Sequence, residues 1–69
     1  MIQVSVNGEN RSVPESLSVR ALLDVLGVPR DRVAVELDRE IVRKSDWETT
    51  VVKPGAKIEI VHFVGGGLA

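Results

Sequence analysis

The chain has 69 residues, which suffices for one small domain whose core only just offsets the conformational entropy of folding, and leaves no room for a large buried active site. Nine basic and ten acidic side chains nearly cancel, and no run of like charge occurs, so nucleic acid and anionic membranes are poor candidate partners. Cysteine is absent, which excludes disulfides, thiolate catalysis and cysteine-based metal sites.

The amino-terminal residues alternate in polarity. Ile2, Val4 and Val6 share one face, which predicts a strand with one side in the core, followed by a tight hairpin turn at residues 7–8 (Asn-Gly). A second strand is expected around residues 11–13, ended by a proline that cannot continue a ladder. This alternation is unlike a signal peptide, and no apolar segment could span a bilayer, so we expect a soluble, cytoplasmic protein.

The next segment has the pattern of an amphipathic helix. Ser18 is a suitable N-cap, and apolar residues recur with helical spacing over residues 19–26. Gly27 provides a C-terminal stop, and the proline at position 29 prevents the helix from resuming. The sequence therefore predicts a helix over residues 19–26 with one apolar stripe, which needs a sheet to pack against.

The second half of the chain predicts three further strands. Residues 33–38 form the third strand, residues 38–40 a polar turn and residues 41–43 a short fourth strand. Trp47 lies in a single-turn or irregular segment and is expected to cover the edge of the core. A Lys-Pro-Gly turn at residues 53–55 then starts the last strand, whose Ile58, Ile60 and His62 alternate with Glu59, Val61 and Phe63.

These elements predict an α+β fold of the β-grasp (ubiquitin-like) type. One main helix crosses one face of a mixed, four- to five-stranded sheet, and the last strand pairs beside the first. We expect the β-grasp domain to span residues 1–64 and residues 65–69 to form a flexible, glycine-rich tail.

No set of residues with catalytic spacing is present, so an enzyme is the least favoured class. His62 is the only histidine, which leaves a metal site without ligands, and no serine lies in a nucleophile motif. The glycines at 65–67 are followed by no helix and no Lys-Ser/Thr pair, which excludes a phosphate-binding loop. No metal and no bound cofactor are therefore expected.

The carboxyl-terminal segment is the best candidate for function. Three glycines after a rigid strand make the thinnest chain available, which suits threading into a narrow channel of another protein, although simple fraying of a terminus explains them too. Val61 and Phe63 should lie on the sheet face away from the helix. The predicted partner-binding residues are Val61, Phe63, Val64, Gly65 and Gly66.

Three segments of this chain resemble the ThiS family of sulfur-carrier proteins of thiamin biosynthesis. They are Ser-Val-Arg-Ala-Leu-Leu at 18–23, Val-Ala-Val-Glu-Leu-Asp-Arg-Glu-Ile-Val-Arg at 33–43 and Ile-Glu-Ile-Val-His-Phe-Val-Gly-Gly-Gly at 58–67. The resemblance implies that an E1-like enzyme of the ThiF type adenylates the terminal glycine carboxylate with ATP. Sulfur from a cysteine desulfurase then gives a thiocarboxylate, which a thiazole synthase of the ThiG type consumes.

The family ends on its glycine, whereas this chain continues with Leu68 and Ala69. We therefore expect a peptidase to remove these two residues and leave Gly67 as the modified terminus. Other readings remain open. The chain also resembles the small subunit of molybdopterin synthase in its fold and its Gly-Gly ending. A carrier for another pathway, such as cysteine or secondary-metabolite synthesis, and a β-grasp module that only binds a partner are further alternatives.

Overall fold

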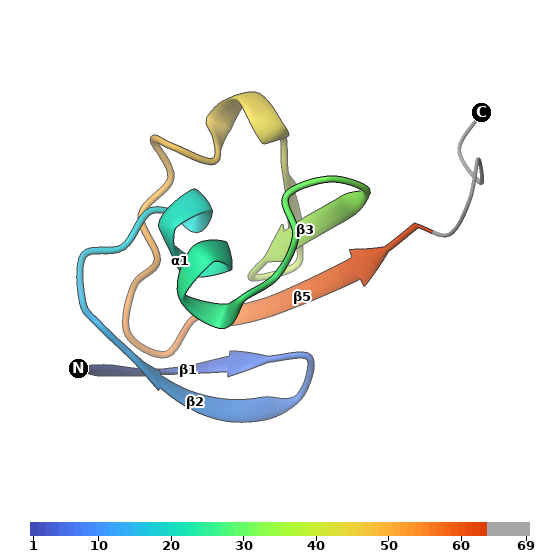
Figure 1. Cartoon of the computed structure of the whole chain (residues 1–69). Helices are drawn as coiled ribbons and strands as arrows, with labels where there is room; N and C mark the ends of the chain where they lie inside the picture. The colour runs from blue at the N-terminus through green and yellow to red at the C-terminus, as the bar shows by residue number, and fades with distance from the viewer. Residues whose placement is uncertain (64–69) are drawn as a thin grey trace.

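The computed structural model describes residues 1–63, which form a five-stranded mixed sheet with one helix across one face (Figure 1). The elements in chain order are β1 (Ile2–Val6), β2 (Glu9–Val13), α1 (Val19–Leu26), β3 (Val33–Leu37), β4 (Glu40–Val42), the 3₁₀-helix η1 (Lys44–Asp46) and β5 (Lys57–His62). This arrangement confirms the predicted α+β, β-grasp fold.

The strands lie in the order β2-β1-β5-β3-β4, so the last strand is the central one. β5 pairs parallel with β1 on one side and antiparallel with β3 on the other. The β1–β2 hairpin and the β3–β4 hairpin are each antiparallel. The connection from β2 through α1 to β3 carries the helix across one face of the sheet (Figure 1). The parallel pairing of β1 with β5 confirms that the last strand pairs beside the first.

The first hairpin turns at Asn7 and Gly8, whose φ values are 50° and 84°. Two consecutive positive φ values are the signature of the type I′ turn that Asn-Gly favours. β2 begins directly after this turn, at Glu9, which is two residues earlier than the sequence indicated. Its exposed residues 9–12 lack the alternation that would have marked the strand, because β2 lies at the edge of the sheet.

The helix has the predicted bounds. The Ser18 side-chain oxygen accepts a hydrogen bond of 3.1 Å from the backbone N–H of Ala21, which satisfies one of the free amides of the first turn. Gly27 ends the helix with φ of 71°, and the backbone N–H of Val28 donates to the Leu23 carbonyl at 2.9 Å. These caps fix both ends of α1 by local chemistry.

The second hairpin differs slightly from the prediction. Asp38 and Arg39 alone form the turn, with φ values of 49° and 73°, so Glu40 already belongs to β4. The Asp38 carboxylate also accepts a 2.9 Å hydrogen bond from the backbone N–H of Lys57, which joins this turn to the start of β5. β4 is therefore shifted by one residue from the predicted 41–43.

The core lies between the sheet and α1, and fourteen hydrophobic residues of the described chain are buried there. Leu22 and Leu23 of the helix have no exposed surface. Trp47 is 3% exposed, and its indole N–H donates to the Val42 carbonyl at 3.0 Å, which confirms that it covers the edge of the core. Within residues 1–63, no helix is long and apolar enough to cross a membrane.

Candidate functional site

β5 is the strand that precedes the candidate tail, and its two faces differ. Ile58 and Ile60 are 1% and 6% exposed, because they point into the core under α1. Val61 lies on the other side of the strand and is 55% exposed. The strand therefore holds its position through one face and presents side chains to solvent through the other.

A side chain extends the pairing of β5 beyond the end of β1. The Asn7 carboxamide donates from Nδ2 to the Ile60 carbonyl at 3.3 Å and accepts from the Ile60 N–H at 2.7 Å. Backbone pairing between β1 and β5 ends near Val6 and Ile58, and Asn7 then takes the place of a further peptide group. In the sequence, Asn7 marks only the hairpin turn, and no pattern there predicts this contact with Ile60.

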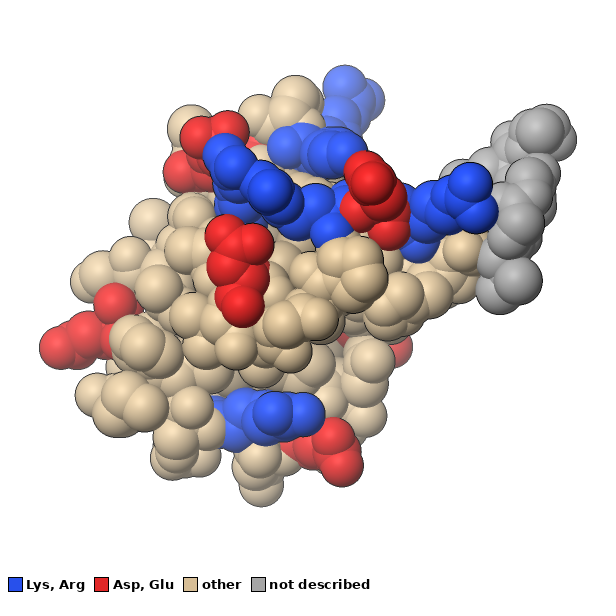
Figure 2. All heavy atoms as spheres, viewed as in Figure 1, with Lys and Arg blue, Asp and Glu red and all other residues tan. Residues whose placement is uncertain are grey.

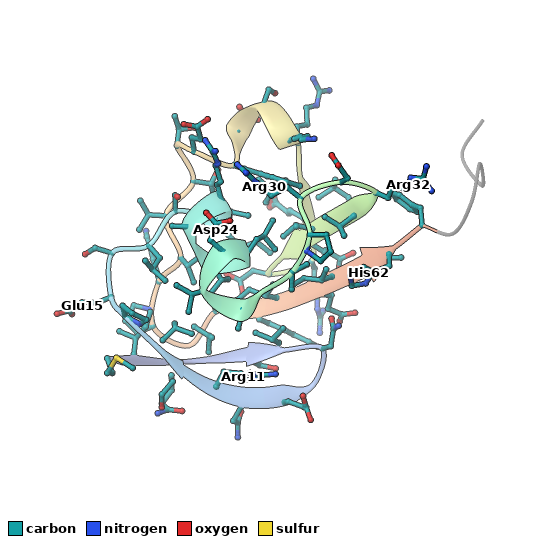
Figure 3. The ribbon with its side chains drawn as sticks, viewed as in Figure 1. Arg11, Glu15, Asp24, Arg30, Arg32 and His62 are labelled. Atoms are coloured by element: carbon teal, nitrogen blue, oxygen red, sulfur yellow. The ribbon has the colours of Figure 1, made fainter. Side chains whose placement is uncertain are left out.

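The end of β5 is held by the loop that precedes β3. The backbone N–H of Phe63 donates to the Arg32 carbonyl at 2.8 Å, and Arg32 has a φ of 60°. Figure 3 shows Arg32 beside the point where β5 ends. Phe63, which the alternation of the strand placed on the sheet face away from the helix, is half-buried. β5 ends at His62, so the alternation does not extend to Phe63.

The other predicted site residues lie outside the described part of the chain. These are Val64, Gly65, Gly66 and Gly67, together with Leu68 and Ala69. The predicted domain boundary after residue 64 also falls there. Of the five predicted partner-binding residues, the structure therefore places Val61 and Phe63, on the last strand and directly after it.

His62 is exposed and lies near the end of β5 (Figure 3). It lines a shallow groove of about 140 Å³ beside the first hairpin and the end of α1, together with Ile60 and Arg11. Among residues 1–63, no group of three potential metal-ligating side chains comes together. The described chain therefore offers no three-ligand metal site around His62.

The side of the molecule seen in Figure 2 carries basic and acidic side chains in close alternation. Ion pairs between described residues include Arg20 with Glu48 at 3.1 Å, Arg30 with Asp24 at 4.0 Å and Lys44 with Asp31 at 4.0 Å. All of these side chains are well exposed, so each pair contributes little to stability. This side presents mixed charge and not a field of one sign.

The sheet face opposite α1, here called the outer face, is uncovered by any element of the described chain (Figure 1). The strand registers place Ala34 and Glu36 of β3, Ile41 of β4, and Glu59 and Val61 of β5 on this face. Ile41 is 66% exposed and Val61 is 55% exposed. These two exposed apolar side chains make the outer face a candidate contact surface.

Comparison with known proteins identifies the family. The model of the ThiS family matches residues 4–67. The crystal structure of the thiamine biosynthesis protein ThiS from Geobacter metallireducens superposes with a TM-score of 0.84 at 38% identity, covering 96% of this chain and all of that one.

Two longer relatives are named thiazole synthase. The protein from Paramagnetospirillum magneticum is 47% identical over 66 residues, and the one from Magnetococcus marinus is 32% identical over 66 residues. Each match covers 96% of this chain but 20% of the relative, so the chain spans about a fifth of the length of these relatives. The family match, which extends over nearly the whole sequence, shows that the chain belongs to the ThiS family.

Proposed function

We propose that this chain is a sulfur-carrier protein of thiamin biosynthesis, and that Gly67 is its modified residue after Leu68 and Ala69 are removed. The observation that carries the proposal is the family match, which extends through Gly67 and stops before Leu68. In this proposal the protein is a carrier that other enzymes act on and not itself an enzyme. Its place of action is the cytoplasm.

The chemistry begins with a carboxylate that is a poor electrophile, because its negative charge is delocalised over two oxygens. A ThiF-type enzyme uses ATP to join the Gly67 carboxylate to AMP, and pyrophosphate leaves. Sulfur from a cysteine desulfurase arrives as a persulfide, whose outer sulfur attacks the acyl carbon while AMP leaves, which gives an acyl disulfide. A thiol of a partner protein then attacks the S–S bond and becomes part of a new disulfide, which leaves a thiocarboxylate on Gly67. This thiocarboxylate carries the sulfur to a ThiG-type thiazole synthase.

The described fold supports this role through the position of β5. The strand is paired on both sides and capped by hydrogen bonds at its end, to Asn7 and Arg32. A segment that follows such a strand starts from a fixed point, so a partner that binds the sheet receives the carboxyl-terminal residues at a defined place. Glycines at 65–67 have no side chains to obstruct a narrow active site.

Thiazole formation is favoured over molybdopterin or other pathways by the names of the relatives. The solved relative is described as a thiamine biosynthesis protein, and two matching relatives are thiazole synthases. A segment similar to this chain occupies a fifth of each of those two proteins. The presence of such a segment within a thiazole synthase supports a thiazole synthase as the partner of this chain.

The intact mass of the protein recovered from its own host tests the proposal. We expect a species that lacks Leu68 and Ala69 and has one oxygen replaced by sulfur, with fragmentation placing the sulfur on Gly67. The matched control is the same host without its ThiF-type enzyme, in which the chain should keep an oxygen-only terminus. A full-length, unmodified chain in growing cells would count against the carrier function.

Substitution of Gly66 by valine sharpens the same test. Gly66→Val should prevent the terminus from entering the activating enzyme, because a β-branched side chain widens the segment that must be threaded. The measurement is ATP–pyrophosphate exchange by the ThiF-type enzyme on chains that end at Gly67. Exchange equal to that of the unsubstituted chain would show that the tail does not need to be thin.

A further inference from the structure

The outer face contains a direct juxtaposition of like charges. Glu36 of β3 and Glu59 of β5 are register partners, so their side chains project from the same face at adjacent positions. Like charges directly opposite each other in a sheet are destabilising. Neither carboxylate takes part in an ion pair between described residues, and Lys57, which shares this face, remains more than an ion-pair distance from both.

Apolar side chains frame these carboxylates. Ile41 is the register partner of Glu36 on its other side, so Glu59, Glu36 and Ile41 form a row across three strands. Val61 lies two residues beyond Glu59 on the same face of β5, opposite the half-buried Ala34. The outer face therefore has two charges side by side, with exposed Ile41 next to them in the same row and exposed Val61 two residues farther along β5.

We propose that the outer face binds the thiazole synthase through a basic side chain of that enzyme, which sits between Glu36 and Glu59 and is flanked by apolar groups that cover Ile41 and Val61. This inference rests on the proposed function, which makes a thiazole synthase the partner. A cation placed between the two carboxylates replaces their repulsion by two attractions. Burial of Ile41 and Val61 against apolar groups of the enzyme adds a hydrophobic contribution.

The choice of a basic partner group follows from charge complementarity. Two neighbouring carboxylates are best compensated at an interface by a positive charge, from arginine, lysine or protonated histidine, and an uncompensated carboxylate is costly to bury. The choice of the thiazole synthase as the partner follows from the two relatives named thiazole synthase. Each of them contains a segment similar to this chain. In those two relatives the matching segment and the rest of the thiazole synthase belong to one chain, which supports a thiazole synthase as the protein that covers this face.

The binding experiment uses the thiazole synthase of the same host and the full chain labelled at its amino terminus, with Kd measured by fluorescence anisotropy. Glu59→Gln should weaken binding about tenfold, and Glu59→Lys should weaken it further, because the new ammonium repels the partner's basic group. Glu15→Gln is the matched control: Glu15 is exposed in the turn before the helix, outside the outer face, and its loss should leave Kd within about twofold.

Thermal unfolding of the same variants separates binding from folding. Glu59→Lys should raise Tm, because a Lys–Glu pair replaces a Glu–Glu pair at these register positions. A variant that is more stable yet binds more weakly cannot owe its loss of affinity to unfolding. Higher salt should also weaken binding of the unsubstituted chain more than binding of Glu59→Gln, since one charge contact has been removed.

Three results would overturn the inference: an unchanged Kd for Glu59→Lys, an equal loss for Glu15→Gln, or no binding of the unsubstituted chain to the thiazole synthase. The proposed carrier function is measured separately, by thiocarboxylate formation on the chain with the ThiF-type enzyme. Normal thiocarboxylate formation with unchanged Kd for the Glu59 variants would therefore reject this docking surface and leave the carrier function standing.

Discussion

The two faces of the sheet are made from the same strands, but one face forms the core and the other is exposed to solvent. The face under α1 contributes Val4, Val35, Ile58 and Ile60, none of them more than 6% exposed. The outer face, one residue away along each strand, keeps Ile41 and other large side chains in solvent. A chain of 69 residues has one core, so stability is concentrated on one face and the other is left available for recognition.

This contrast predicts that substitutions on the two faces of the sheet affect different properties of the protein. A change on the helix side should lower the free energy of unfolding strongly, whereas a change on the outer face should alter binding with little effect on unfolding. Contacts at the end of β5 should give intermediate losses. The following three experiments test this order, from the largest expected change in stability to the smallest.

Leu23→Ala should cause the largest loss, because Leu23 has no exposed surface and lies in the centre of the core. Truncation of a buried leucine costs about 2–5 kcal/mol, which is a large part of the total stability of a small domain. Urea denaturation followed by circular dichroism measures the loss. Val25→Ala on the same helix is the control: Val25 is 52% exposed, and its truncation should change the free energy by no more than about 0.5 kcal/mol.

Asn7→Gly should cause an intermediate loss. Glycine keeps the positive φ of the turn but removes both hydrogen bonds to Ile60, which we expect to cost about 1–3 kcal/mol in urea denaturation. Asn7→Asp retains the acceptor for the Ile60 N–H but sets a carboxylate oxygen against the Ile60 carbonyl in place of the Nδ2 donor. Its cost at neutral pH should therefore be as large as that of Asn7→Gly or larger, and it should fall when the carboxyl is protonated at low pH and can donate. A small loss for Asn7→Gly would mean that the two hydrogen bonds to Ile60 contribute little.

Ile41→Ser should cause the smallest loss of stability. The side chain is 66% exposed on a short edge strand, so the free energy of unfolding should change by no more than about 0.5 kcal/mol. Its affinity for the thiazole synthase should nevertheless fall several-fold. Val51→Ser is the control, because Val51 is similarly exposed, at 51%, but lies away from the outer face. It forms a β-bridge with Ser18 beside the start of α1. Equal effects of both variants on affinity would argue against a specific role of the outer face.

Features set by neighbouring residues could be predicted from the sequence. The helix has the predicted bounds because Ser18 and Gly27 act on backbone groups within four residues of themselves. The first hairpin turn was equally predictable, since Asn-Gly strongly favours positive φ at both positions. The predicted pairing of the last strand with the first is also confirmed.

Features that depend on register or on rare conformations could not be predicted. Arginine seldom adopts positive φ, so nothing in the sequence marked Arg39 as the second residue of the turn that shifts β4. The opposition of Glu36 and Glu59 requires the pairing of β3 with β5, which are separated by twenty residues or more along most of their length. The contact between Asn7 and Ile60 spans 53 positions in the chain and depends on where β1 leaves the sheet.

The roles assigned to residues 64–67 rest on the sequence and the family, since the structure describes the chain only through residue 63. The structure adds the position of Phe63, the residue that precedes this segment. Strand alternation placed Val61 and Phe63 together on the solvent-exposed face of the sheet. In the structure, Val61 is exposed on the sheet, whereas Phe63 is half-buried beyond the end of the strand. Strand alternation is a reliable guide only within the strand itself.

The parallel pairing of β1 and β5 determines how the domain resists a pulling force. β1 begins at the amino terminus and β5 runs beside it in the same direction toward the carboxyl terminus. Tension applied between the two ends therefore slides these strands past one another. The hydrogen bonds between them, including those of Ser5 with Ala56 and Asn7 with Ile58, are loaded together and not opened one by one. An enzyme that pulls on the tail would meet the most resistant direction of the sheet.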